Sequence, residues 1–181
     1  MLVLHKSNEV FNVKKIVLLV SLLMVILGSV AFAADSDQYL WLYSTDKVGY
    51  YLDTQSITYK TNSDKTLDKN IVTIYSKAVF NDEGRQAVTD RLTEKNLDTT
   101  KAQQINYLIA KIEYNCTSQK YIPVYSYIYD LDNELISRKV YDNSSSLDIV
   151  PGSTDDKLFK PILAYIHTHD KEITAATQAN P

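Results

Sequence analysis

Few residues in this chain have the side-chain chemistry of a catalytic or metal site. Beyond the first 33 residues, the reactive set is one thiol, Cys116, and two imidazoles, His167 and His169. Two residues apart on a helix, the imidazoles point to different faces, whereas a helical metal pair needs a spacing of three or four. In an extended segment they could share a metal or haem iron, but the sequence offers no third ligand nearby. We therefore predict no metal site and no cofactor.

The Cys116 thiol would be a nucleophile only in a setting that lowers its pKa. The stretch Tyr114-Asn115-Cys116-Thr117 has neither a Gly-rich loop nor a helix start, which are the settings that stabilise a thiolate. Alternation over residues 104–116 instead places Cys116 on an inward face with aliphatic side chains. We predict a buried structural cysteine and no enzymatic activity. An unpaired thiol also leaves open a homodimer linked between chains.

Carboxylates gather at one turn. Asp130, Asp132 and Glu134 alternate there, and alternating acids can bind calcium. The segment lacks the twelve-residue calcium pattern and its Gly, however, so a hairpin turn at Asp132-Asn133 is the better interpretation.

Tyrosine is in unusual excess, with 14 Tyr against 4 Phe and 1 Trp. In residues 120–131, alternation predicts one face that carries Tyr121, Tyr125, Tyr127 and Tyr129. Exposed Tyr is a favoured anchor for protein partners. Two alternatives stay open: the rings could cover the sheet beneath a helix, or they could stack on a small ligand such as haem or a glycan.

The elements that must position these side chains are mostly strands. Strand patterns occur at residues 39–43, 49–53, 56–59, 71–80, 104–116, 120–131 and 134–141, with a polar loop at 61–70. Helical spacing occurs at about 83–95 and at 154–170, where Ser153 is a candidate N-cap and Pro161 should kink or split the helix. We predict an α+β fold: a single antiparallel sheet of about six strands, a C-terminal helix packed on one face, and a short helix inserted mid-chain.

The first 33 residues read as a cleavable signal peptide. Lys14 and Lys15 precede an apolar run, and small residues close it, which predicts cleavage between Ala33 and Ala34. An uncleaved anchor helix is the alternative, because the run approaches the roughly 20 residues that span a bilayer. We expect residues 34–173 to form the exported domain, in the periplasm, at the cell surface or secreted, with residues 174–181 as a disordered tail. Contact with the membrane is then only through the signal peptide.

Charge and cysteine content narrow the partners. The formal net charge is −3, and cleavage would remove three Lys and one Glu, leaving a more acidic domain. Such a surface argues against nucleic acid as a partner. A lone Cys excludes an intramolecular disulfide despite the oxidising destination.

The order of features resembles the surface-adhesin protein E family of exported bacterial proteins. The resemblance covers most of the mature chain and is carried by these stretches: the Trp41 strand, residues 51–57, 72–78 and 113–116, Tyr127-Ile128-Tyr129-Asp130, and Ile149-Val150-Pro151-Gly152-Ser153 leading into Leu158-Phe159. It implies structural roles for Trp41, Cys116, Pro151 and Gly152.

The resemblance also implies a function and one departure from the family pattern. Family members bind host extracellular-matrix and serum proteins, so a non-enzymatic surface or envelope protein with a protein partner is expected. The family's counterpart of Cys116 pairs with a Cys in the C-terminal helix, and the matching place, near Leu163, has none. Packing by Leu158, Ile162 and Leu163 must then hold the helix, at about 1.5 to 3 kcal/mol per buried side chain.

Overall fold

A computed structural model describes residues 38–95, 98–142 and 145–179. The predicted cleavage site, Ala33 and Ala34, lies outside the described residues. Within them, seven strands form one antiparallel sheet in the spatial order β1-β2-β3-β4-β5-β6, and β7 pairs with β5. The strands are β1 Tyr39–Ser44, β2 Val48–Thr61, β3 Leu67–Phe80, β4 Ile105–Asn115, β5 Lys120–Asp130, β6 Leu135–Val140 and β7 Leu147–Asp148.

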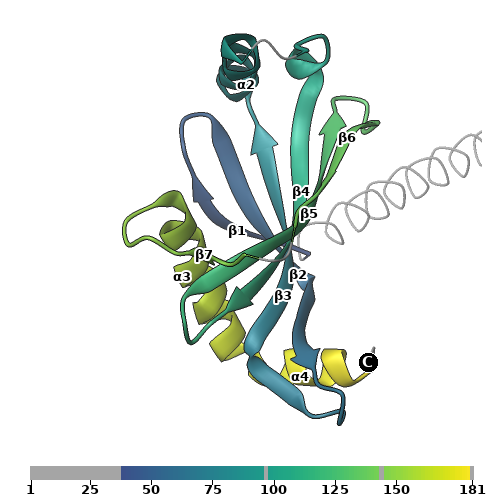
Figure 1. Cartoon of the computed structure of the whole chain (residues 1–181), viewed down its shortest axis with the longest axis vertical. Helices are drawn as coiled ribbons and strands as arrows, with labels where there is room; N and C mark the ends of the chain where they lie inside the picture. The colour runs from purple at the N-terminus through teal and green to yellow at the C-terminus, as the bar shows by residue number, and fades with distance from the viewer. Residues whose placement is uncertain (1–37, 96–97, 143–144, 180–181) are drawn as a thin grey trace, which may run out of the picture. The chain divides into compact units, whose positions relative to one another are not determined.

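The sheet is a meander, because each of the first six strands pairs with the next along the chain (Figure 1). The α+β prediction is confirmed. Two details differ from the sequence pattern: residues 48–61 form one continuous strand with a register shift between Asp53 and Thr58, and β3 begins at Leu67. The predicted polar loop at 61–70 is therefore a short turn, because β2 and β3 extend their ladder through alternating polar residues.

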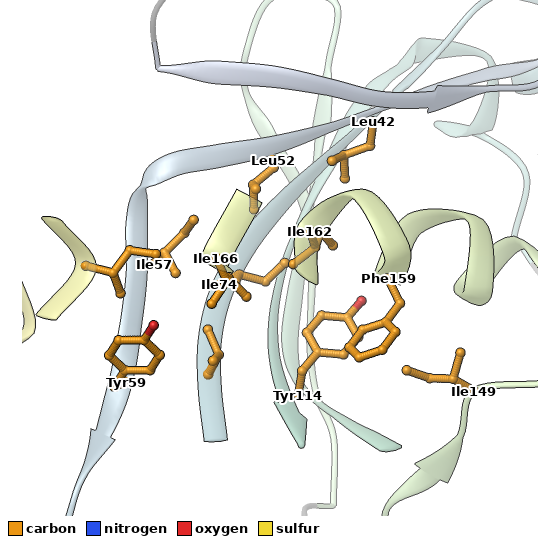
Figure 2. Packing of buried hydrophobic residues seen from close by; sticks show 12 residues of the cluster. Leu42, Leu52, Ile57, Tyr59, Ile74, Tyr114, Ile149, Phe159, Ile162 and Ile166 are labelled. Carbon is orange, nitrogen blue, oxygen red and sulfur yellow. The ribbon is translucent and has the colours of Figure 1, made fainter. Parts of the chain in front are cut away.

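Helix α3, Thr154–Thr168, covers one face of the sheet (Figure 1). Ser153 caps it, since the Ser153 Oγ accepts a hydrogen bond from the Asp156 N–H at 3.2 Å. Phe159, Ile162 and Ile166 share one helical stripe and are buried, with Ile162 only 1% exposed. Figure 2 shows this stripe against the strand side chains of the core.

The strand side of the core is aliphatic with two tyrosines. Its buried members are Leu42, Leu52, Ile57, Tyr59, Val72, Ile74 and Tyr114, joined by Ile149 from the loop before α3. The Tyr114 ring lies 5.4 Å from the Phe159 ring, centroid to centroid. The core therefore lies between the sheet and α3, as the family resemblance implies.

The C-terminal region differs from the expectations in two respects. The helix does not split at Pro161, because it runs unbroken to Thr168. A second helix, α4 Asp170–Ala179, replaces most of the predicted disordered tail. Ile173 and Thr177 lie four residues apart on its buried side. The Thr177 Oγ accepts a hydrogen bond from the Tyr59 N–H at 3.0 Å, so the sheet backbone binds this segment.

Helix α2, Asp82–Glu94, confirms the predicted mid-chain helix. Asn81 caps it through a 2.9 Å bond from the Gly84 N–H. Gly84 is required for close approach, because a Cβ there would lie 2.3 Å from the Lys47 carbonyl oxygen. The 3₁₀ turn η1, Ala102–Gln104, contacts α2 through a 2.8 Å bond between the Gln103 and Gln86 side chains.

Candidate functional site

Side chains on the sheet face opposite α3 and α4 are mainly aromatic and cationic. Ile74 and Ile112 pair across β3 and β4 and face the core, so their neighbours Tyr75 and Lys111 point the other way. Following that alternation across the sheet collects one set of side chains, which are half-buried except for the exposed Arg138. We call this set the tyrosine platform: Tyr39, Asp53, Tyr75, Lys77, Tyr107, Ile109, Lys111, Glu113, Tyr125, Tyr127, Tyr129 and Arg138.

A bulge in β5 divides the predicted tyrosine stripe. Ile112 pairs with Pro123 and Lys111 with Tyr125, so Val124 is an extra residue on β5. The extra residue reverses the alternation, and it sends Tyr125, Tyr127 and Tyr129 to the platform but Tyr121 to the core face. The prediction that all four share a face is therefore wrong for Tyr121.

Tyr121 lies beneath α3. Its ring is 6.0 Å from the Tyr114 ring, and its hydroxyl donates a 3.2 Å hydrogen bond to Asp155. Burial, with the Asp155 carboxylate beside it, raises the pKa of the Tyr121 phenol. One tyrosine of the stripe thus covers the sheet under the helix, while the other three do not.

The platform rings order one another. Tyr107 and Tyr129 stack with centroids 4.9 Å apart and planes 19° apart. Tyr127 meets Tyr125 edge to face at 5.1 Å, and the Tyr125 hydroxyl bonds that of Tyr75 at 2.5 Å. Burial and this bond raise the pKa of Tyr125, so it stays a neutral phenol. Pre-ordered rings lose little further rotamer entropy on binding, which favours them as anchors.

Cations are interleaved with these rings. The Lys77 Nζ lies 4.3 Å from the Tyr107 ring centroid and 5.0 Å from that of Tyr39. The Lys111 Nζ is 5.8 Å from the Tyr125 centroid. The Arg138 guanidinium lies 5.6 Å from the Tyr127 centroid. Cation–π attraction holds the half-buried Lys77 and Lys111 side chains against the face of the sheet, whereas Arg138 is exposed at its edge.

A shallow hollow of about 220 Å³ opens in the platform. It is lined by Tyr39, Asp53, Tyr75, Ser76, Lys77, Ile109, Tyr127 and Tyr129. The Asp53 Oδ1 accepts the Gln55 N–H at 3.1 Å, which fixes the carboxylate at the hollow. The hollow thus offers ring faces, one carboxylate and one ammonium to a ligand.

A second polar cluster, which the sequence patterns did not predict, lies between the sheet and the C-terminal helices. A hollow of about 360 Å³ there is lined by Tyr59, Lys69, Asn70, Cys116, Thr117, Leu163, Ile166, His167 and Asp170. Asp170 accepts hydrogen bonds from Tyr59 at 2.7 Å and from Lys69 at 2.8 Å. The two bonds hold the pKa of Asp170 below its usual range. Because these residues are far apart in sequence, only the position of α4 brings them together.

Cys116 opens into this second hollow and packs against the core. Burial raises the pKa of its thiol, which is the opposite of what a nucleophilic cysteine requires. His167 lines the same hollow, whereas His169 stacks on Tyr165 with ring centroids 3.9 Å apart. The structure places a thiol and an imidazole around one space but does not activate the thiol. A homodimer through Cys116 stays a prediction.

The residues Trp41, Pro151 and Gly152 have local structural roles. Trp41 is 58% exposed on the edge strand β1 and donates a 2.8 Å bond to the Ser44 hydroxyl, so it is not part of the core. Gly152 adopts φ +80°, and the Ser153 N–H bonds the Val150 carbonyl at 3.1 Å. Pro151 and Gly152 thus form the central positions of a turn that precedes α3.

The acidic turn shapes a hairpin. Asp130 Oδ1 accepts the N–H groups of Asp132 at 3.0 Å and Glu134 at 2.7 Å.

Among the residues that the structure describes, no group of three or more His, Cys, Asp and Glu side chains could hold a metal ion. In the same residues, no helix combines the length and the apolar character that a bilayer crossing requires.

Comparison with known proteins found similar chains among the solved structures. No protein-family model and no curated protein matches the chain. Several of the structural neighbours are crystal structures of Haemophilus influenzae protein E. The crystal structure from non-typeable H. influenzae is 14% identical, with a TM-score of 0.39 over 78% of this chain and 89% of that chain. A selenomethionine form is 13% identical, with a TM-score of 0.43 over 75% and 90%.

These neighbours bear the name of the family that the sequence resembles. A likeness this distant does not carry a function from one protein to the other. What the chain does must be argued from its own surface, above all from the tyrosine platform.

Proposed function

We propose that this chain is an exported, non-enzymatic bacterial surface or envelope protein that binds a protein partner, of the host or its extracellular matrix, through the tyrosine platform. The observation that carries the proposal is the bulge-defined face, which presents ordered tyrosines and cations opposite the helices that enclose the core. Export rests on the signal peptide predicted to end at Ala33, and the family resemblance implies the same class of protein.

The platform has the composition of a protein-binding surface. Tyrosine combines a large apolar area with a hydroxyl and has only two side-chain torsions to restrict, so it is enriched among the few residues that carry most of the binding energy. Truncating such an anchor costs about 2 kcal/mol or more of binding energy. A partner covering the platform would gain from several anchors that the sheet already holds in place.

Partner capture tests this proposal. Protein purified after expression of the full chain is immobilised and exposed to extracellular-matrix and serum proteins. We expect Tyr125→Ser with Tyr127→Ser to weaken capture about 30-fold or more, as removal of an interface anchor does. Tyr141→Ser is the matched control, because the Tyr141 hydroxyl lies 3.3 Å from that of Ser126, which faces away from the platform.

Circular dichroism and thermal melting must show that both variants keep the fold. Equal capture by the platform variant and the control would contradict the proposal. Unfolding of the platform variant would instead show that these tyrosines are structural, and Tyr127→Phe, which keeps the ring, then separates folding from binding.

A second candidate is a small-ligand site, for haem or a glycan, and the hollow between Tyr39 and Tyr127 favours it. At about 220 Å³, the hollow is below the roughly 300 to 1,000 Å³ of ordinary ligand pockets, so it would hold only part of such a ligand. Among the described residues that line it, none is His, the commonest protein ligand of haem iron. A haem titration without a Soret shift would remove the haem version.

A further inference from the structure

We propose that the group recognised by the tyrosine platform is an acidic polysaccharide carried by the partner, a chain of sugar rings that bear carboxylates or sulfates. The inference rests on the proposed function, because it assigns the chemistry of the same surface. It differs in stating that sugar rings and their charges, rather than polypeptide, make the contacts. Charge, the shape of the hollow and the spacing of the cations each point to such a ligand.

The platform is cationic on an acidic chain. Lys77, Lys111 and Arg138 carry three positive charges on this face against the two carboxylates of Asp53 and Glu113, whereas the chain as a whole has a formal net charge of −3. None of the three cations forms an ion pair with a carboxylate of the described residues. The face therefore keeps a net positive charge, which the tyrosine rings offset only weakly, so an anionic ligand gains more from this face than a neutral one.

The hollow suits a sugar ring. An aromatic face is negative and an aromatic edge is positive, so the slightly positive C–H groups of a sugar ring pack on the face of a tyrosine. Asp53, fixed by the Gln55 N–H, can accept hydrogen bonds from sugar hydroxyls, and Lys77 stands at the same hollow for an acidic substituent. An acidic peptide would use the ammonium but would leave the ring faces uncovered.

The cations are distributed for an extended ligand. They lie on three different strands, with Lys77 on β3, Lys111 on β4 and Arg138 on β6. Neighbouring strands are about 4.8 Å apart, so the cations extend over roughly 15 Å across the sheet. A single small anion would reach one or two of them, whereas a linear polyanion can contact all three.

Isothermal titration calorimetry tests the inference with three probes of similar length. These are a heparin-derived tetrasaccharide, the neutral sugar maltotetraose and a hexaglutamate peptide. We expect the tetrasaccharide to bind, with an affinity that falls as salt rises, and the other two to bind at least about tenfold more weakly. The protein is the full chain as expressed, titrated at low and at moderate ionic strength.

Charge variants locate the binding. Lys77→Met with Lys111→Met keeps the apolar stems of both side chains and should weaken tetrasaccharide binding about tenfold. Lys139→Met is the matched control, because Lys139 pairs with Ser126 on the opposite face and lies 4.5 Å from the Tyr141 ring. Melting curves show whether the variants keep the fold, and Arg138→Gln supplies a second platform variant if the double variant does not.

The outcomes separate this inference from the proposed function. Equal binding of maltotetraose, or hexaglutamate binding as tight as that of the tetrasaccharide, would overturn the polysaccharide. Equal weakening by Lys139→Met would also overturn it. If no sugar binds while partner capture still depends on Tyr127, the inference fails and the proposed function stands. If tetrasaccharide binding is platform-dependent but no protein is captured, the proposed protein partner fails instead.

Discussion

Gly152 shows how one residue without a side chain positions a whole helix. It follows Pro151 in the turn before α3, with φ at +80°, and a Cβ added there would meet nothing within 4 Å. The cost of any other residue is therefore purely conformational. We expect Gly152→Ala to lower the free energy of unfolding by about 1 to 2 kcal/mol, as an L-residue in the left-handed region does.

Gly152→Asn is the matched control, since Asn tolerates a positive φ better than Ala does. Both variants keep the N–H that donates to the Asp156 carboxylate at 2.9 Å. Urea unfolding should therefore rank the glycine protein above the asparagine variant, and that above the alanine variant, with an unchanged dependence on urea. An alanine variant as stable as the original would show that the turn relaxes to a negative φ.

The tyrosines of β5 show what simple alternation could and could not predict. Simple alternation placed Tyr125, Tyr127 and Tyr129 together, as the structure does, but it also placed Tyr121 with them. The missing signal was Pro123, because a proline inside a strand lacks the N–H of the ladder and is confined to edges, strand starts and bulges. A reading that took Pro123 as a bulge marker would have reversed the alternation at the correct place.

At the level of elements, most strands and helices α2 and α3 could be predicted, because their buried residues recur every two residues in strands or about every 3.6 in helices. Helix α4 could not, since its buried side has only one apolar residue of any size, Ile173, and a polar one, Thr177. Thr177 is stable in the core because its hydroxyl donates to the Ile173 carbonyl and accepts from the Tyr59 N–H. Tyr59, whose N–H donates to that hydroxyl, is 118 residues away in the sequence, so no local pattern predicts the contact.

The docking of α4 should depend on pH through Asp170. Its pKa is held low by hydrogen bonds from Lys69 and Tyr59, so its contribution to stability is present above the ordinary Asp pKa of about 3.9. That contribution is lost as the pH falls through the lower pKa of the folded protein. We expect Asp170→Asn to speed hydrogen exchange of the α4 amides at pH 7, and the difference from the original protein to be smaller at pH 2.

Asp148→Asn is the control for this experiment. Asp148 forms an exposed pair with Lys120 at 3.2 Å, without a tyrosine hydroxyl, on the short strand β7. It should leave α4 exchange unchanged at both pH values, because isolated surface pairs contribute little. Protection of α4 that does not differ between Asp170→Asn and the original protein at pH 7 would mean that Ile173 and Thr177 alone hold the helix.

On the scale of the whole molecule, the two faces of the sheet have different roles. One face is enclosed by α3 and α4 and supplies the core, while the other carries the tyrosine platform. The bulge at Val124 affects both faces, because it places Tyr121 on the core face and the following tyrosines on the platform. Substitutions on the platform should therefore alter binding with little effect on folding, whereas the helix layer decides stability.

That helix layer is held without a covalent bond, and this can be tested by adding one. The family resemblance implies a disulfide between Cys116 and a position near Leu163, and in the structure both residues line one hollow of about 360 Å³ and pack against the core. We expect Leu163→Cys to form an intramolecular disulfide under oxidising conditions. Closing a loop of this length should add about 4 kcal/mol to the free energy of unfolding, less any strain and the lost leucine packing.

Thiol counting and urea unfolding with and without reductant measure this effect in one variant. Leu163→Ser is the control for the lost packing, since it removes the leucine but cannot form the bond. An oxidised Leu163→Cys protein more stable than its reduced form would show that α3 lies on β4 in the register described. Two free thiols after oxidation would mean that the helix sits elsewhere along the sheet, because a disulfide forms only when the two Cα atoms are within about 7 Å.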